Sequence, residues 1–287
     1  MNIVITGADG FLGRHLCAAF LLQGWKVTGL VRNPHRKRLI EGVEYHHYEF
    51  PANLAATALV KSFDVLVHCA FAMTGNRADY DVNREASAFL QQQFQSTRML
   101  FVSSMSAHAD AESLYGREKL YIESTLDLRR DVALRPGFII GDGGVFQNLA
   151  RSIRKLPLIP LFYGGQQPIQ TVHVADLCAA VCVLIGGGGT GVISYGEEEP
   201  VLLREFYQAI AQGLGVKRTL MRLPGGLTLS GLRLAERLGV RLPMTSENLL
   251  GLKRLIRVPV ASDRIRLGLP IPRTMSESLA TVNWSSL

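Results

Sequence analysis

The sequence predicts an α/β protein in which helices cover both faces of a doubly wound parallel sheet. Short β-branched and apolar runs alternate with stretches of helical periodicity through residues 1–136. The run at residues 64–70 is almost wholly apolar, as a strand is when helices cover both faces of its sheet. A glycine-rich turn joins the first run to the first helical stretch, as it does in many doubly wound folds.

The first half of the chain contains the clearest elements. Strands are expected at residues 2–6, 26–31, 43–50, 64–70, 98–103 and 131–135. Helices are expected at residues 14–23, 80–95 and 114–126. In the first helix Leu16, Ala19 and Phe20 lie at helical spacing, and Gly24 follows as a C-cap. The alternation of strand and helix predicts that neighbouring strands run parallel.

Beyond Pro136 and Gly137 the alternation loosens, because prolines and glycines interrupt a mixed segment at residues 157–165. The remaining strands are expected at residues 169–174 and 191–195, and the remaining helices at 175–185, 203–214, 226–238 and 246–254. We therefore predict two parts that are discontinuous in sequence. Residues 1–136 and about 169–200 form the sheet domain, and residues 137–168 and 201–287 form a small, mostly helical C-terminal region.

The charge is unevenly distributed. The 287 residues carry a net charge of +7, from 31 Lys and Arg against 24 Asp and Glu, and 47% of them are apolar. This composition can bury a core, which excludes a wholly disordered chain. Residues 215–273 hold 12 basic and 3 acidic residues, a surplus of 9, whereas the rest holds 19 and 21. The basic stretch predicts a phosphorylated ligand, a membrane surface or nucleic acid as partner, and a solvated helical face is the alternative.

Several classes are not supported by the sequence. The longest apolar run, residues 172–185, is interrupted by His173 and Asp176 and is too short to cross a bilayer. No basic segment precedes an apolar one at the start of the chain, so we expect a cytoplasmic protein. The four cysteines form no C-x-x-C pair and lie among apolar residues, which favours reduced, buried thiols. No His/Cys cluster has zinc spacing, so no metal site is expected.

Three glycines, Gly7, Gly10 and Gly13, lie between the first strand and the first helix. At such a place the chain must turn tightly, let its backbone approach a pyrophosphate and pack the helix closely on the strand. The N–H groups at the start of the helix are then free to bind phosphate. The spacing and its context therefore predict a dinucleotide-binding turn.

The end of the second strand indicates which dinucleotide binds. An acidic residue there would accept a hydrogen bond from the ribose 2′-hydroxyl, but this chain has Arg32 and Asn33. Arg14 follows the glycine turn, and three more basic residues stand at 36–38. Guanidinium groups suit a 2′-phosphate, so NADP(H) is favoured over NAD(H). The alternative is that Arg32 merely ends a strand in solvent.

A second motif places Tyr115 and Lys119 four residues apart, on one face of a predicted helix. A nearby cation favours phenolate and so lowers the pKa of a tyrosine toward a range useful for proton transfer. The motif follows the strand that ends at Ser103 and Ser104. Ligands of open α/β sheets bind at the carboxyl ends of the strands, so these groups are candidates for catalysis.

Taken together, these stretches resemble the short-chain dehydrogenases/reductases, in the extended or atypical group of NAD(P)-dependent epimerases and dehydratases. The resemblance lies in six stretches that occur in family order: residues 6–13, 64–70, 81–84, 102–104, 134–137 and 172–176. It covers about residues 1–200 and implies a Rossmann-like NAD(P)-binding domain with a C-terminal substrate-binding region.

The resemblance implies a role for each matching residue. Tyr115 would be the acid/base, Lys119 would bind the nicotinamide ribose and lower the Tyr115 pKa, and Ser104 would bind the substrate oxygen. Asn83 would support the proton relay. Substrate would also contact Met105 and Asn148, although Asn148 could instead cap a following helix. The residues expected to bind the cofactor are Gly7, Gly10, Phe11, Leu12, Gly13, Arg14, Arg32, Asn33, Glu49, Phe50, Cys69, Ala70, Phe71, Tyr115, Lys119, Pro136 and Gly137.

The implied reaction is hydride transfer at a carbinol or carbonyl carbon of a sugar nucleotide or related small carbonyl compound. The net reaction is reduction, epimerisation or dehydration, since all three use this step. The basic C-terminal part makes a phosphorylated substrate the expected partner, and nucleic acid the least expected one. A homodimer is expected by resemblance. His108 lies in a loop that departs from the family pattern and could face substrate or solvent. The alternative function is a non-catalytic NAD(P)H-binding sensor or accessory subunit.

Overall fold

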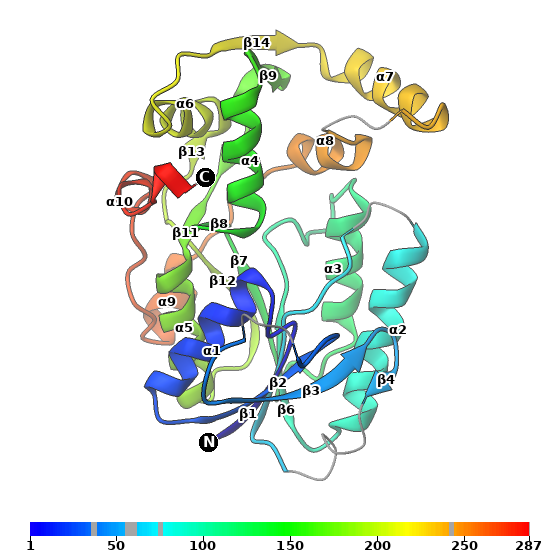
Figure 1. Ribbon diagram of the computed structural model, residues 1–287, viewed down its shortest axis with the longest axis vertical. Helices are drawn as coiled ribbons and strands as arrows, with labels where there is room; N and C mark the ends of the chain where they lie inside the picture. Colours follow the sequence, from blue (N-terminus) through cyan, green and yellow to red (C-terminus); the bar gives the residue numbers. More distant parts are fainter. Residues whose placement is uncertain (36–38, 55–61, 74–76, 241–243, 287) are drawn as a thin grey trace.

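The computed structural model describes residues 1–35, 39–54, 62–73, 77–240 and 244–286. Its centre is an eight-stranded sheet in the order β12-β7-β6-β5-β1-β2-β3-β4 (Figure 1). The strands of this sheet are β1 (Asn2–Thr6), β2 (Lys26–Val31), β3 (Val43–Glu49), β4 (Asn53–Leu54), β5 (Val65–His68), β6 (Arg98–Val102), β7 (Val132–Pro136) and β12 (Gly191–Tyr195). All neighbours pair parallel except β3 and β4.

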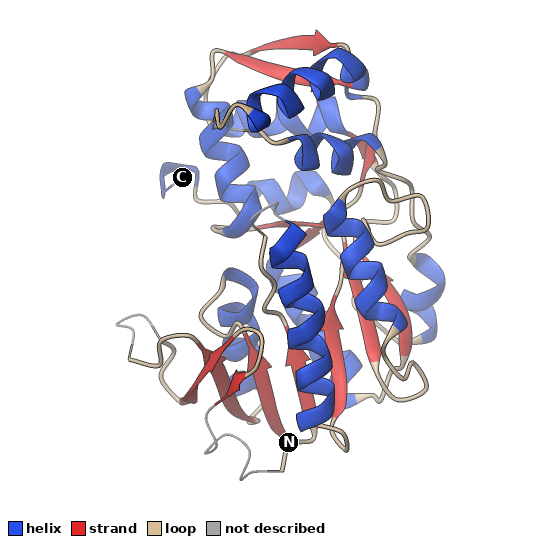
Figure 2. Ribbon diagram, turned by 90° about the vertical axis from the view of Figure 1, so that its right-hand side faces the viewer, coloured by secondary structure: helices blue, strands red, loops and turns tan. Residues whose placement is uncertain are grey.

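Helices form a layer on each face of this sheet (Figures 1 and 2). Helices α1 (Phe11–Leu22) and α5 (Val174–Gly186) pack together on one face, where their apolar residues join the core of β1 and β5. Helices α2 (Arg77–Gln93) and α3 (Leu114–Ser124) cover the other face with Leu90 and Ile122. The predicted Rossmann-like, doubly wound α/β fold is therefore confirmed.

The order in which the chain adds strands to the sheet reverses between β1 and β5, although the two strands run parallel. Strands β2 and β3 lie on one side of β1, and β5, β6, β7 and β12 lie on the other. The turns that leave β1 and β5 therefore part in opposite directions. The crevice between such turns, at the carboxyl ends of the strands, is where open α/β sheets bind ligands.

The remaining elements lie beyond the carboxyl ends of the strands, toward the end of the molecule opposite the N-terminus, except for a short helix at residues 261–266 that lies beside β12 (Figure 1). Their strands pair two by two: β8 (Phe138–Ile140) with β11 (Thr171–His173), β9 (Leu158–Phe162) with β14 (Thr219–Leu223), and β10 (Pro168–Ile169) with β13 (Val201–Leu202). Their helices are α4 (Gly144–Lys155), α6 (Leu203–Gly213), α7 (Gly225–Arg237), α8 (Ser246–Lys253), α9 (Ala261–Arg266) and α10 (Met275–Ala280). A second apolar core joins α4, α6 and α10 through Phe146, Phe206 and Leu279.

Several features differ from the sequence predictions, which did not include β4, β8, β9, β14, α9 or α10. The strand expected at residues 169–174 is divided between β10 and β11, which pair outside the large sheet, and only β12 rejoins that sheet. Residues 144–155, for which no helix was predicted, form α4, whose buried Phe146, Ala150 and Ile153 lie at helical spacing after the glycines at its start. Leu267 and Leu269, which follow α9, pack with the core of the large sheet. The predicted two-part division of the chain remains a prediction.

Within the described part of the chain, no helix is long and apolar enough to cross a membrane.

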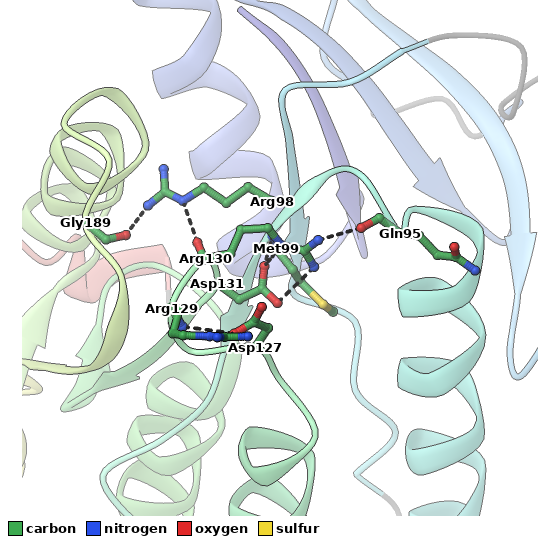
Figure 3. A network of polar contacts seen from close by, with 8 residues as sticks. All are labelled: Gln95, Arg98, Met99, Asp127, Arg129, Arg130, Asp131 and Gly189. Atoms are coloured by element: carbon green, nitrogen blue, oxygen red, sulfur yellow. Dashed lines mark hydrogen bonds and ion pairs between the residues drawn. The ribbon is translucent and has the colours of Figure 1, made fainter.

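A polar network fixes the amino ends of β6 and β7, away from the crevice (Figure 3). The guanidinium of Arg98 donates to the backbone oxygens of Leu184, at 3.0 Å, and Gly189 at the end of α5. The buried carboxylate of Asp131 accepts from the Met99 backbone N–H and from Arg130 Nε, both at 2.9 Å. The network therefore joins two strands and a helix end whose polar groups would otherwise be buried without partners.

We predict that Asp131→Ala lowers the free energy of unfolding by about 1–3 kcal/mol, because it leaves the Met99 N–H buried and unpaired. Asp127→Ala is the matched control, since Asp127 pairs with Arg129 at the surface and such pairs contribute little. Urea unfolding of both variants measures the difference. Equal losses would contradict the assigned role of Asp131.

Candidate functional site

The glycine turn leaves no room for side chains. Gly7 has a φ of +65°, and a Cβ on it would lie 3.1 Å from the backbone of Ala70 in the loop after β5. A Cβ on Gly13 would lie 2.1 Å from the Gly7 carbonyl oxygen, which is a severe clash. Helix α1 therefore starts directly against the end of β1, with its free N–H groups at the crevice.

A hydrogen-bonded pair that sequence reasoning missed joins this turn to the next loop. Thr6 Oγ1 lies 2.7 Å from His68 Nδ1 and accepts a hydrogen bond from the Ala70 N–H at 3.1 Å. Burial lowers the pKa of His68 to about 3, and the Lys119 cation adds to this shift. His68 is therefore neutral and ties β1 to β5 at the bottom of the crevice. Its position in a buried strand was the only available sequence signal.

Asn83 holds the loop that follows β5. Its side chain donates to the Ala72 carbonyl oxygen at 3.0 Å and accepts from the Ala72 N–H at 2.8 Å. These two bonds fix the backbone beside Phe71, whose ring lies edge-on to the Tyr115 ring at 5.6 Å between centroids. The structure thus shows Asn83 positioning a loop of the site, while its predicted part in proton relay stays a prediction.

The predicted catalytic residues come together at the carboxyl end of β6. A side-chain hydrogen bond joins Ser104 to Tyr115 in the first turn of α3. Burial raises the pKa of Tyr115 above its ordinary value, and the bond with Ser104 offsets part of this rise. We expected Lys119 to lower this pKa, and the net direction is opposite. The Lys119 Nζ lies 5.9 Å from the Tyr115 ring centroid and donates to a backbone oxygen instead.

Lys119 is almost fully buried, with 4% of its surface exposed. Its Nζ donates to the Val102 carbonyl oxygen at 2.7 Å and lies 3.8 Å from the Phe71 ring centroid and 4.6 Å from that of Phe101. Burial lowers the pKa of Lys119 to about 7, while the nearby carboxylate of Glu123 favours its charged form. Aromatic faces attract an ammonium group, so the two rings partly replace its lost hydration.

A buried ionic network lies below Lys119, and sequence reasoning missed it as well. Glu123 lies one turn further along α3. Its carboxylate accepts a hydrogen bond from Arg135 Nε of β7 at 2.9 Å and another from the Ser103 hydroxyl after β6. The network fastens α3 to both strands. The sequence offered only the four-residue spacing of Glu123 from Lys119 as a signal.

The C-terminal elements hold the start of the same helix. Glu247 Oε2 in α8 accepts from the Leu114 N–H at 2.6 Å, directly before Tyr115. Glu112 binds the Lys253 and Arg254 side chains at 2.7 and 2.6 Å. His108 Nε2 lies 2.9 Å from the Arg254 carbonyl oxygen, so the structure places this histidine against α8. The position of Tyr115 is thereby linked to α8.

The expected adenosine-side residues lie at the carboxyl ends of β2 and β3. Arg32 and Asn33 are exposed, Arg14 is half-buried in the first turn of α1, and Glu49 is exposed. The Phe50 ring lies 6.3 Å from the His68 ring, centroid to centroid, so it borders the crevice. The basic residues 36–38 lie outside the described residues.

The last group of predicted residues borders the crevice from the β7 side. The Met105 N–H donates to the Pro136 carbonyl oxygen at 3.3 Å, and a Cβ on Gly137 would lie 2.6 Å from the Gln170 carbonyl oxygen. Asn148 is exposed in the interior of α4, so it does not cap this helix. Helix α4 starts beside Phe11 of the glycine turn, which packs against Gly143.

The model of the NAD dependent epimerase/dehydratase family matches residues 3–192. The chain therefore belongs to this family. It is an NAD(P)-dependent enzyme of the short-chain dehydrogenase/reductase type, and a general oxidoreductase role follows.

Two curated relatives are similar to the chain over most of its length. A ceramide reductase from Caulobacter vibrioides (strain NA1000 / CB15N) is 29% identical over 241 residues, which cover 77% of this chain and 73% of the relative. The 4-hydroxy-2-methyl-3-oxo-4-farnesyl-3,4-dihydroquinoline-1-oxide ketoreductase from Stigmatella aurantiaca is 23% identical over 276 residues, or 83% and 80% of the two chains.

Solved structures share the fold. The UDP-glucuronic acid 4-epimerase from Bacillus cereus, in complex with NAD, superposes with a TM-score of 0.74 and 17% identity, covering 100% of this chain and 96% of the other. The human epimerase family protein SDR39U1 (isoform 2), with NADPH, gives a TM-score of 0.71 and 16% identity over 98% of this chain and all of that one (100%).

We predict that Lys119 makes stability rise with pH. Its pKa is about 7 in the folded chain against an ordinary value of 10.5, so between these two pH values the unfolded chain binds more protons than the folded chain. The folded state therefore gains stability between about pH 7 and pH 10, and Lys119→Met should remove up to about 1.4 kcal/mol per pH unit from this slope. Urea unfolding across this range, with exposed Lys26→Met as control, measures it. Unchanged slopes in Lys119→Met would contradict the prediction.

Proposed function

We propose that the chain is a ketoreductase that uses NADP(H) to reduce a carbonyl group to a carbinol. The observation that carries this proposal is the grouping of Ser104, Tyr115 and Lys119 at the carboxyl end of β6, next to the glycine turn. A protein that only senses or stores the nucleotide has no need of a half-buried phenol beside a serine hydroxyl.

The residues of the crevice fit a dinucleotide. A Cβ at Gly7 or Gly13 would clash with backbone, so the glycines allow the close strand-to-helix packing that a pyrophosphate-binding turn requires. Ala70 and Phe71, held by Thr6 and Asn83, form the opposite wall. When bound, the nicotinamide supplies the hydride.

The chain itself orients the carbonyl and moves the proton. The Ser104 hydroxyl donates to the carbonyl oxygen of the substrate and keeps it beside the Tyr115 phenol. Tyr115 then gives its proton to that oxygen as the alcohol forms, and its raised pKa keeps the proton on the phenol until then. The Lys119 ammonium, within 5.9 Å of the ring, stabilises the phenolate that remains. The aromatic rings and α8 keep water away from these groups.

The basic end of β2 supports a preference for NADP(H). Arg32 is exposed where an acidic residue would bind the ribose 2′-hydroxyl, and Arg14 lies in the first turn of α1. Guanidinium groups bind phosphate through two parallel hydrogen bonds. These two side chains are therefore our candidates for the 2′-phosphate site.

The names of the two curated relatives support an apolar ketone as substrate, because one is a ceramide reductase and the other a farnesyl-quinoline ketoreductase. Phe71 and Met105 are partly exposed and Met73 is exposed, so the loops after β5 and β6 carry apolar surface. A sugar nucleotide is the second candidate, and the exposed Asn148 on α4 favours it. A phosphorylated substrate, a cytoplasmic location and a homodimer through α2 and α3 remain part of the proposal.

Arg32→Glu should weaken NADPH binding by about tenfold or more without weakening NADH binding, because only NADPH carries the 2′-phosphate and a carboxylate there can accept from the 2′-hydroxyl of NADH. Fluorescence titration of both nucleotides measures this. Lys26→Glu, at the opposite end of the same strand, is the matched control for net charge. Equal affinity of the unaltered chain for the two nucleotides would overturn the preference.

Tyr115→Phe should lower kcat by at least about a hundredfold, as loss of a general acid does, with NADPH affinity unchanged. The assay follows NADPH consumption with long-chain ketones in one arm and nucleotide-linked keto sugars in the other, which separates the two substrate candidates. Tyr121→Phe, an exposed tyrosine on the same helix, should keep full activity. A kcat of Tyr115→Phe close to that of the unaltered chain would refute the role of the phenol.

A further inference from the structure

Helix α7 lies at the far end of the molecule from the N-terminus, above α8 (Figure 1). It has apolar residues on two opposite sides. One side is covered by the protein: Leu232 is buried with Leu249 and Phe162, and Gly225 lies against the Tyr163 ring. Packing of this side accounts for the attachment of α7 to the rest of the chain.

The other side of α7 is bare. Leu227, Leu234 and Leu238 are 76%, 58% and 72% exposed, respectively. Residues seven and eleven positions apart fall on one face of a helix, so these leucines form a continuous stripe opposite the packed side. Val240, just beyond, is 50% exposed. Scattered exposed leucines are ordinary, but an aligned stripe on one helix marks an interaction surface.

The charges around the stripe are of one sign. Arg233 and Arg237 of α7 are exposed beside it, and Arg222 is exposed on the preceding strand. The one acidic residue of α7, Glu236, points the other way, where it accepts hydrogen bonds from the Ser246 N–H at 2.6 Å and the Ser246 hydroxyl at 2.7 Å. The bare side of α7 is therefore apolar along its centre and cationic along its flank.

We propose that this side of α7 docks on an anionic lipid surface. An amphipathic helix of this kind lies in the plane of the interface, with its leucines among the acyl chains and its arginines at the lipid phosphates. A second copy of the chain fits less well, because an antiparallel pair of α7 helices would set the arginines of both copies on the same flank. Arg222, Arg233 and Arg237 are three of the 12 basic residues at positions 215–273.

The position of α7 makes such docking useful to the proposed reaction, although the inference does not rest on it. Helix α7 packs on α8, and Glu247 of α8 caps the helix that carries Tyr115. Docking would therefore place the bilayer next to the element that packs on α8, which itself holds the start of the helix that carries Tyr115.

Flotation of the full chain with vesicles tests the proposal. Vesicles of equal parts phosphatidylglycerol and phosphatidylcholine should bind the chain, and pure phosphatidylcholine vesicles should bind it at least about tenfold less well. The double variants Leu234→Glu with Leu238→Glu, and Arg233→Glu with Arg237→Glu, should each lose about tenfold or more in binding to the mixed vesicles. Leu22→Glu and Lys26→Glu, which alter equally exposed residues on other elements, should bind as the unaltered chain does.

Circular dichroism and turnover of a water-soluble ketone, which the variants should leave unchanged, show that the variants fold. Failure to bind mixed vesicles, or equal binding by the α7 and control variants, would overturn the proposal. So would a dimer, seen by sedimentation, that the leucine variants dissolve, because the stripe would then be covered by a second copy. If turnover is absent while α7-dependent vesicle binding persists, the proposed reaction fails and this inference stands.

Discussion

The close approach of the β1 turn to the β5 loop is the constraint on which the site depends. Gly13 lies on the Gly7 carbonyl and Gly7 lies on Ala70, with no space for a Cβ at either glycine. Thr6 holds the two segments together by bonding His68 and the Ala70 N–H. The start of α1 is thereby placed at the crevice, and the loop that carries Phe71 is placed against Tyr115. Tyr115 and the glycine turn border the same loop because of this contact.

A second feature of the site is the Lys119 ammonium, which the structure holds in an apolar setting. The ammonium is removed from water, which costs free energy and lowers its pKa. The Val102 carbonyl, two aromatic faces and the nearby Glu123 offset part of that cost. Glu123 is itself bound by Arg135, so its charge is held in place from β7. The helix that carries Tyr115 is also capped from α8, which connects the C-terminal elements to the chemistry.

The elements whose sequence signal is local could be predicted. The glycine turn, the buried strands and the spacing of Tyr115 and Lys119 each depend on a few neighbouring residues. In the structure the strands form the large sheet, and the turn and the two side chains lie at its carboxyl edge. The contacts of Glu123 with Arg135 and of Glu247 with Leu114 could not be predicted, because they join segments that only the tertiary fold brings together. Helix α4 was missed because its opening glycines, Gly143 and Gly144, and the following Pro157 suggested a loop. The direction of the Tyr115 pKa shift depends on burial, which spacing does not reveal.

The central claim is that this crevice transfers hydride to a carbonyl carbon while Tyr115 supplies the proton. It is tested most directly with NADPH deuterated at C4 on the nicotinamide ring and a set of long-chain ketones, with mass spectrometry of the product. The account predicts one deuterium on the new carbinol carbon, and its loss in Tyr115→Phe. Tight NADPH binding with no deuterium transferred to any ketone or keto sugar would contradict the account and favour a nucleotide-binding protein without turnover.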